Sequence, residues 1–141
     1  MSRVVSVRLK DEQVARLQRA ASSLGKSPSE AAALLLEESL REREYAFIEF
    51  RDSPAGRQPY LSGTRLAVWH VAVLAREYEG DASKTAAYLE IPEGDVKAVL
   101  AYASAYRDEI DAAIADDEWV AEHLLPLTPG FKVITVDAAA P

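Results

Sequence analysis

A short N-terminal segment combines an alternating apolar pattern with a basic side chain. Positions 4–9 read V-V-S-V-R-L, and alternate residues of a β-strand lie on the same face. One face would be purely apolar and would carry Val5, Val7 and Leu9. The other face would carry Val4, Ser6 and Arg8. Because arginine and small hydroxyl side chains bind base edges in the major groove of DNA, this second face has the chemistry of a base-reading surface.

The elements around this segment must supply a partner, because a lone strand is not stable in water. The residues that follow, from Asp11 onward, have a helical pattern and provide no second strand. The simplest partner is the same segment of a second chain, which would form a two-stranded antiparallel ribbon that fits the major groove. The alternative is an edge strand of a small α+β domain, with Arg8 exposed to solvent.

Two helices are expected after the strand. The acidic residues at positions 11 and 12 suit the positive end of a helix dipole, and Gly25 is a suitable stop. In the next segment, K-S-P-S-E, Ser27 is the expected N-cap of a second helix and Glu30 completes a capping box. The second helix should run to about Glu44. Its inward-facing residues are predicted to be Ala31, Leu34, Leu35 and Leu40.

The strand, the helix, the glycine turn and the capped helix together resemble the ribbon-helix-helix family of DNA-binding proteins over residues 2–44. The resemblance implies an intertwined homodimer that binds double-stranded operator DNA. It implies that the base-reading residues are Val4, Ser6 and Arg8, although Val4 offers only an apolar contact. It also implies phosphate contacts, partly through N–H groups that begin the second helix, at Arg3, Lys26, Ser27 and Ser29.

The charge distribution favours an anionic partner for the N-terminal segment alone. The chain has 141 residues and a formal net charge of -7. Residues 1–26 contain six basic and two acidic side chains, a charge of +4, whereas residues 27–141 carry -11. This asymmetry favours nucleic acid at the N-terminal end and a different kind of partner for the rest of the chain.

Residues 45–118 are predicted to form a second, mainly helical domain. The β-favouring residues 47–50, a turn-rich segment and the stretch Y-L-S-G-T-R-L-A-V predict a short hairpin. The helices that follow should begin near Val68, Ala82 and Glu93, the last with a break near Arg107. The apolar stripe of this long helix should comprise Val96, Val99, Leu100, Ala103, Tyr106, Ile110 and Ile114.

The stretch S-G-T-R-L-A-V at residues 62–68, with the helices after it, is similar to a small helix-turn-helix family, domain-of-unknown-function family 433. The resemblance covers about residues 46–115. Members are frequently antitoxins, or domains of them, that pair with a PIN-type ribonuclease toxin. A helix-turn-helix normally binds DNA, but the expected recognition helix opens with Glu93 and Asp95, which phosphates would repel. We therefore interpret this domain as a dimerisation or partner-binding module.

Residues 119–141 are predicted to form an extended C-terminal tail that binds a partner protein. The tail contains the strand-like segment F-K-V-I-T-V, which suits addition to the sheet edge of another protein. The predicted toxin-binding residues are Trp119, Leu124, Leu125, Phe131, Lys132 and Ile134. The alternative is that the tail packs on its own domain.

Residue types that support catalysis are sparse. The chain has no cysteine, no phosphate-binding glycine loop and no zinc-protease spacing. His70 adjoins Trp69 in an apolar helix and is interpreted as a core or interface histidine, while His123 lies in the tail. The adjacent carboxylates at 116–118 would point in different directions on a helix, which indicates a solvated face. We therefore expect no catalytic residues, no metal and no cofactor.

The sequence thus predicts a mainly α protein with a ribbon-helix-helix domain at residues 1–44, a helix-turn-helix-like domain at 45–118 and a tail at 119–141. The predicted function is that of a type II antitoxin, which represses its own operon and neutralises a cognate toxin, a PIN-domain ribonuclease if the resemblance holds. The alternative is a stand-alone ribbon-helix-helix transcriptional regulator whose C-terminal half only oligomerises. Without a membrane-length apolar run or a signal-peptide core, a cytoplasmic protein with no membrane partner is expected.

Overall fold

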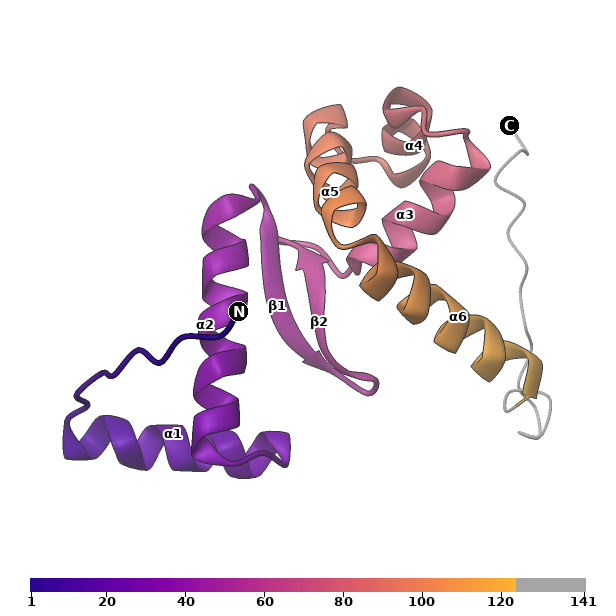
Figure 1. The fold of residues 1–141 in the computed structure, drawn as a ribbon. Helices are drawn as coiled ribbons and strands as arrows, with labels where there is room; N and C mark the ends of the chain where they lie inside the picture. The colour runs from indigo at the N-terminus through magenta and orange to yellow at the C-terminus, as the bar shows by residue number, and fades with distance from the viewer. Residues whose placement is uncertain (124–141) are drawn as a thin grey trace. The chain divides into compact units, whose positions relative to one another are not determined.

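The structure is a computed structural model that describes residues 1–123 of the chain. This part is mainly helical, with six helices and one two-stranded antiparallel sheet (Figure 1). The chain divides into two compact units, the first at Met1–Arg41 and the second from Glu42 onward. None of the described helices is both long enough and apolar enough to cross a membrane.

The first unit contains helix α1 (Asp11–Leu24) and most of helix α2 (Pro28–Glu44). Residues 1–10 have no regular secondary structure, so the predicted strand at residues 4–9 is not formed within the single chain. The predicted pairing was with the same segment of a second chain, and a lone strand is not stable in water, so this pairing stays a prediction.

Helix α1 ends and helix α2 begins as their local sequence signals predict. Gly25 ends α1 in a left-handed conformation, with φ of 66°, and the N–H of Lys26 donates to the carbonyl of Ala21 at 2.9 Å. At the start of α2, the N–H of Glu30 donates to Ser27 Oγ at 3.2 Å. The N–H of Ser27 in turn donates to Glu30 Oε1 at 3.3 Å, which completes the predicted capping box.

The first unit has very little core of its own. Among its apolar residues only Ala21 and Ala31 are buried. The prediction that Leu40 points inward is wrong for the single chain, since its exposed fraction is 44%. The other large apolar side chains that this unit exposes are Met1, Val4, Val5, Val7, Leu9, Val14 and Leu36.

The second unit begins with the predicted hairpin. Strand β1 (Ile48–Ser53) pairs antiparallel with β2 (Gly56–Leu61), with Ile48 opposite Leu61 and Ser53 opposite Gly56. The stretch after Leu61 does not continue the strand, because it turns back and leaves a single bridge between Tyr60 and Ala67. This bridge anchors the hairpin to the start of the next helix.

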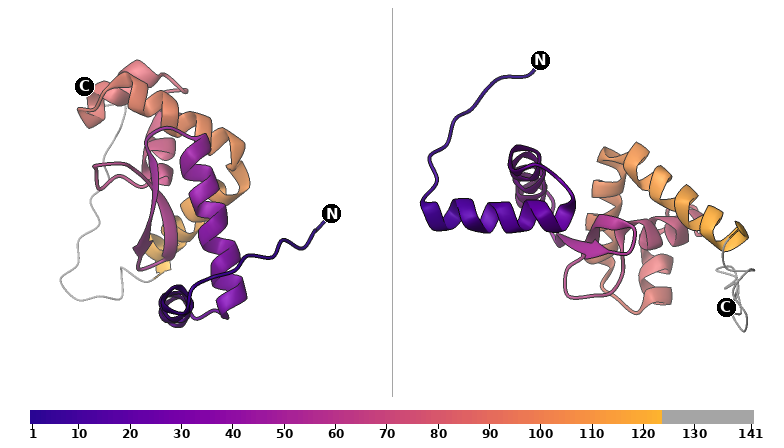
Figure 2. Two further views of the ribbon diagram at one scale, coloured as in Figure 1. Left: turned by 90° about the vertical axis from the view of Figure 1, so that its left-hand side faces the viewer. Right: turned by 90° about the horizontal axis from the view of Figure 1, so that it is seen from below.

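Four helices complete the described part of the second unit: α3 (Val68–Glu77), α4 (Ala82–Leu89), α5 (Glu93–Ala105) and α6 (Arg107–His123). Helix α3 is central, because it contacts α4, α5, α6 and strand β2 (Figure 2). The predicted break near Arg107 is present between α5 and α6. Helix α6 runs past position 119, where the tail was predicted to begin.

Tyr102 lies at the centre of the core, although the predicted stripe of α5 did not include it. Its side chain is fully buried, and its ring meets those of Tyr45 and Phe50 edge-on, with centroid distances of 5.3 and 6.3 Å. Of the predicted stripe, the residues that are buried in the structure are Val96, Val99, Ile110 and Ile114. Aromatic packing between the hairpin, the segment before it and α5 therefore supplements the helix-to-helix core.

Candidate nucleic-acid interface

The predicted base-reading residues are all available to a partner. Val4, Ser6 and Arg8 are exposed, as is the nearby Arg3. Arg8 forms no hydrogen bond or ion pair with another described residue. The segment thus presents a basic side chain without an internal counter-charge, which is the first requirement for a contact with DNA.

The start of α2 offers fewer free phosphate donors than the sequence suggested. The N–H of Ser27 is already used by the carboxylate of Glu30, and the N–H of Glu30 by the hydroxyl of Ser27. Pro28 has no N–H group. The remaining donors of the first turn are the N–H and hydroxyl groups of Ser29, which donate to no described residue. Lys26 is the exposed cation beside them.

Glu30 opposes phosphate binding at this position. Hydrogen bonds from the side chain and backbone of Ser27 hold the pKa of Glu30 below its ordinary value, with a smaller contribution from the charge of Lys26. The carboxylate is therefore ionised at neutral pH and lies at the helix terminus that a phosphate would approach. A phosphate must either tolerate this charge or displace the Glu30 side chain from the cap.

The second unit presents a less suitable surface to DNA. Helices α4 and α5 are joined by a short turn, as in a helix-turn-helix, and the first turn of α5 carries Glu93 and Asp95. The nearby cation, Lys97, forms an ion pair with Glu93, with a distance of 3.2 Å between Nζ and Oε1. These acidic side chains would repel a phosphate backbone.

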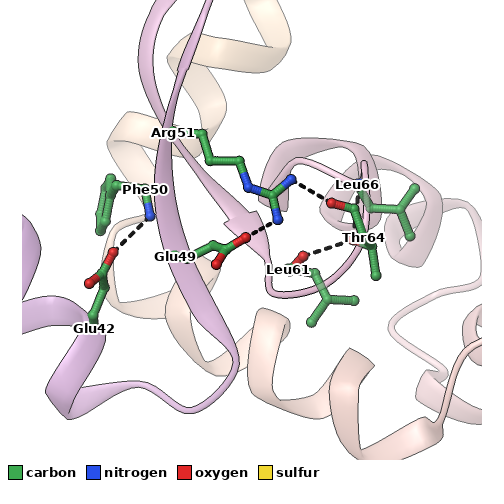
Figure 3. A network of polar contacts seen from close by, with 7 residues as sticks. All are labelled: Glu42, Glu49, Phe50, Arg51, Leu61, Thr64 and Leu66. Carbon is green, nitrogen blue, oxygen red and sulfur yellow. Dashed lines mark hydrogen bonds and ion pairs between the residues drawn. The ribbon is translucent and has the colours of Figure 1, made fainter.

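The motif Gly63-Thr64-Arg65 forms a structural corner between β2 and α3. Gly63 has φ of 74°, which favours glycine. Thr64 Oγ1 donates to the carbonyl of Leu61 at 2.8 Å and accepts from the N–H of Leu66 at 3.0 Å (Figure 3). Arg65 is exposed to solvent. The conformation of this motif is therefore explained by chain geometry.

A second network ties this corner to the hairpin. Arg51 donates to the carbonyl of Thr64 at 2.5 Å and forms an ion pair with Glu49 (Figure 3). Glu42 accepts a hydrogen bond from the N–H of Phe50 at 2.9 Å. Arg51 of the hairpin and Glu42 of α2 thus hold the strands and the corner in place, and the charges of Arg51 and Glu49 are paired with each other.

The structure also contains a pocket that sequence reasoning missed. It has a volume of about 460 Å³ and lies entirely within the second unit. Its lining includes Tyr60 and Gln58 of β2, Trp69 and His70 of α3, Ala113, Asp116 and Asp117 of α6, and the hairpin turn at Ser53, Pro54 and Ala55. Only two features of the sequence pointed to this pocket, the adjacent Trp69-His70 pair and the carboxylates at 116–118, and neither feature indicated that the two lie close together.

His70 lies at the surface of this pocket rather than in the core. Its Nδ1 accepts a hydrogen bond from the N–H of Ala67 at 3.3 Å, and its ring centroid is 3.7 Å from that of Trp69. Burial lowers the pKa of His70, and the charge of Asp117 opposes this shift. The imidazole is therefore neutral at pH 7, with its proton on Nε2 because Nδ1 accepts a hydrogen bond.

The predicted tail contacts lie outside the described residues. This applies to the side chain of Trp119 and to Leu124, Leu125, Phe131, Lys132 and Ile134. Within the described part of the chain, no three His, Asp or Glu side chains are placed to hold a metal ion together. Among the described residues, this pocket and the N-terminal segment are the candidate sites considered for function.

Comparisons with known proteins do not identify a relative. No family model, no curated protein and no solved structure matches this chain. The features of the molecule that bear on its function are the N-terminal segment, the charge distribution and the pocket.

Proposed function

We propose that this protein is a DNA-binding antitoxin. Two copies of the first unit pair through residues 4–9 into a ribbon-helix-helix dimer that binds operator DNA. The second unit and the tail bind and neutralise a toxin, which the sequence resemblance suggests is a PIN-type ribonuclease. By binding the operator, the dimer represses the transcription of its own operon.

One observation carries this proposal. The alternating apolar segment at residues 4–9 is exposed, and the two helices that follow it bury almost no apolar side chains. Val5 and Val7 have exposed fractions of 84% and 75% in the single chain. Burying a valine side chain contributes about 1.5–3 kcal/mol, so a second copy that covers this face provides a substantial driving force for dimerisation. Pairing would also give the backbone groups of residues 4–9 the inter-strand hydrogen bonds of a ribbon.

In such a ribbon the opposite face would present Ser6 and Arg8 from both chains to the major groove. Arg8 has no internal counter-charge, and a bidentate contact between arginine and guanine is the most common specific protein–DNA contact. Ser29 and Lys26 at the start of α2 would add contacts to phosphate, which position the ribbon without reading sequence. The acidic first turn of α5 supports a different role for the second unit.

The test is to measure both activities with the full chain. A gel-shift assay on the DNA upstream of the gene should show binding that weakens steeply as salt rises, because phosphate contacts release counterions. Co-expression with the product of the adjacent gene should yield a complex and should restore growth that this product alone inhibits.

Two outcomes would reject parts of the proposal. If the chain does not shift its upstream DNA at low salt, operator binding is wrong. If it binds DNA but neither co-purifies with nor protects against an adjacent gene product, the stand-alone regulator becomes the better description.

A further inference from the structure

The pocket of the second unit has aromatic and acidic walls and is named here the Trp69 pocket. Trp69 and His70 of α3 form one wall, and Asp116 and Asp117 of α6 form another. The lining is mainly apolar, and its volume of about 460 Å³ is within the range of pockets that hold a ligand or an inserted side chain.

The charges around the pocket leave a negative excess. Both basic residues of the hairpin strands are ion-paired: Arg51 with Glu49, and Arg57 with Asp52, the latter at 3.2 Å. In contrast, Asp116 and Asp117 form no hydrogen bond or ion pair with another described residue. His70 adds no positive charge at neutral pH, because burial lowers its pKa.

The aromatic residues of the pocket suit a flat cation. The guanidinium of Arg51 lies 4.9 Å from the ring centroid of Tyr60, so one aromatic ring of this lining already holds an arginine. The indole of Trp69 is partly exposed at the pocket and is the better cation–π acceptor. The hydroxyl of Ser53 is occupied by Gly56 and Ala55, so it does not compete for a ligand.

We propose that the Trp69 pocket receives an arginine side chain from a partner protein. The apolar stem lies against the lining, and the guanidinium contacts Trp69 and the carboxylates of Asp116 and Asp117. Arginine fits better than lysine, because its planar guanidinium stacks on an indole and pairs with carboxylate through two parallel hydrogen bonds. The inference rests on the partner-binding half of the proposed function and names the chemistry of the partner.

The experiment is a titration of the full chain carrying Trp119→Phe, which leaves Trp69 as the single tryptophan of the chain. The probe is a glycine-flanked peptide with one central arginine. The matched probe carries citrulline, which has the same shape without the charge. Indole fluorescence and the indole N–H resonance of Trp69 report binding, and both readouts are independent of any toxin or DNA.

We expect the arginine peptide to perturb Trp69 and to bind at least about fivefold more tightly than the citrulline peptide, since each carboxylate contributes a modest ion pair. The double variant Asp116→Asn/Asp117→Asn should reduce the affinity for the arginine peptide by a similar factor. Glu118→Gln is the control for the loss of one carboxylate charge from the neighbouring exposed position of α6, which does not line the pocket. The single variant Asp116→Asn matches this control in charge and should still lower the affinity.

Three outcomes would overturn the proposal: equal binding of the arginine and citrulline peptides to the unchanged pocket, an unaltered affinity in the double variant, or an equal loss in Glu118→Gln. Saturation of Trp69 by free guanidinium or spermidine, without binding of the peptide, would also reject a protein partner. Because the probes are peptides, failure here leaves the antitoxin proposal standing. Failure to neutralise a toxin leaves the peptide result standing.

Discussion

At the scale of single residues, Arg8 is the side chain on which operator recognition depends. We expect Arg8→Ala to weaken operator binding by about 1–3 kcal/mol for each bidentate base contact that is lost, and to relax sequence preference. Folding should barely change, because Arg8 is exposed and has no partner among the described residues. A quantitative gel shift on the operator and on a scrambled sequence measures both effects.

The control for Arg8→Ala is Arg65→Ala, which removes the same charge from an exposed position in the second unit. Its operator affinity should stay close to that of the wild type. Wild-type affinity in the Arg8 variant would show that the N-terminal segment does not read the bases.

His70 should give the second unit a measurable pH dependence. Because burial lowers the pKa of His70 below its ordinary value of 6.5, the unfolded chain binds the proton more readily than the folded chain does. The contribution of neutral His70 to the free energy of unfolding is therefore complete above pH 6.5. It is lost as the pH falls towards the pKa of His70 in the folded protein. The melting temperature of the wild type should fall more between pH 7.5 and pH 5.5 than that of His70→Gln.

The carboxylate of Asp117 opposes the shift of His70, so the variant Asp117→Asn should enlarge this pH dependence. A wild-type protein and a His70→Gln variant that lose stability in parallel would show that other groups dominate over this range.

At the scale of elements, the start of α2 has two competing roles. Glu30 caps the helix through Ser27, yet its charge lies where a phosphate would bind. Glu30→Gln keeps the capping box, since glutamine also accepts the hydrogen bond, but removes the charge. We expect this variant to remain folded and to bind operator DNA more tightly than the wild type in a gel shift at fixed salt.

Glu118→Gln removes a carboxylate from α6 and serves as the control for a change in net charge alone. If Glu30→Gln and Glu118→Gln strengthen operator binding equally, the effect is one of net charge alone. If the operator affinity of Glu30→Gln equals that of the wild type, the phosphate does not bind at the start of α2.

The elements that sequence predicted correctly have signals within a few residues. Gly25 in the left-handed conformation and the Ser27–Glu30 capping box fix helix ends locally, so the boundaries of α1 and α2 could be located. Tyr102 could not be placed, because its burial depends on Tyr45 and Phe50, which are far away in sequence. The Trp69 pocket was missed for the same reason: α3 and α6 build it together with the hairpin.

At the scale of the whole molecule, the first unit should be stable only as a dimer. Its apolar segment at residues 4–9 is exposed in one chain, and only Ala21 and Ala31 form a buried apolar core there. We expect Val7→Ser to raise the dissociation constant of the dimer at least about tenfold, because each copy loses a buried valine. Light scattering over a concentration series measures this change.

Ser6→Ala lies on the opposite face of the predicted strand and should leave dimerisation unchanged. A wild-type protein that is folded and monomeric at micromolar concentration would reject the intertwined dimer. An equal effect of the two substitutions would indicate that the alternation of faces is wrong.

The tail should separate the two activities of the protein. Helix α6 is described as far as His123, so truncation after His123 keeps its described residues and removes residues 124–141. The removed segment contains Leu124, Leu125, Phe131, Lys132 and Ile134, the residues predicted to bind the toxin by strand addition and pocket filling. The basic segment at residues 1–26 lies in the other unit of the chain, so operator binding should persist. Gel shift and pull-down of the adjacent gene product by both forms measure the separation. Equal capture of this product by the truncated form would refute the role of the tail, while a loss of folding would show that the tail packs on its own domain.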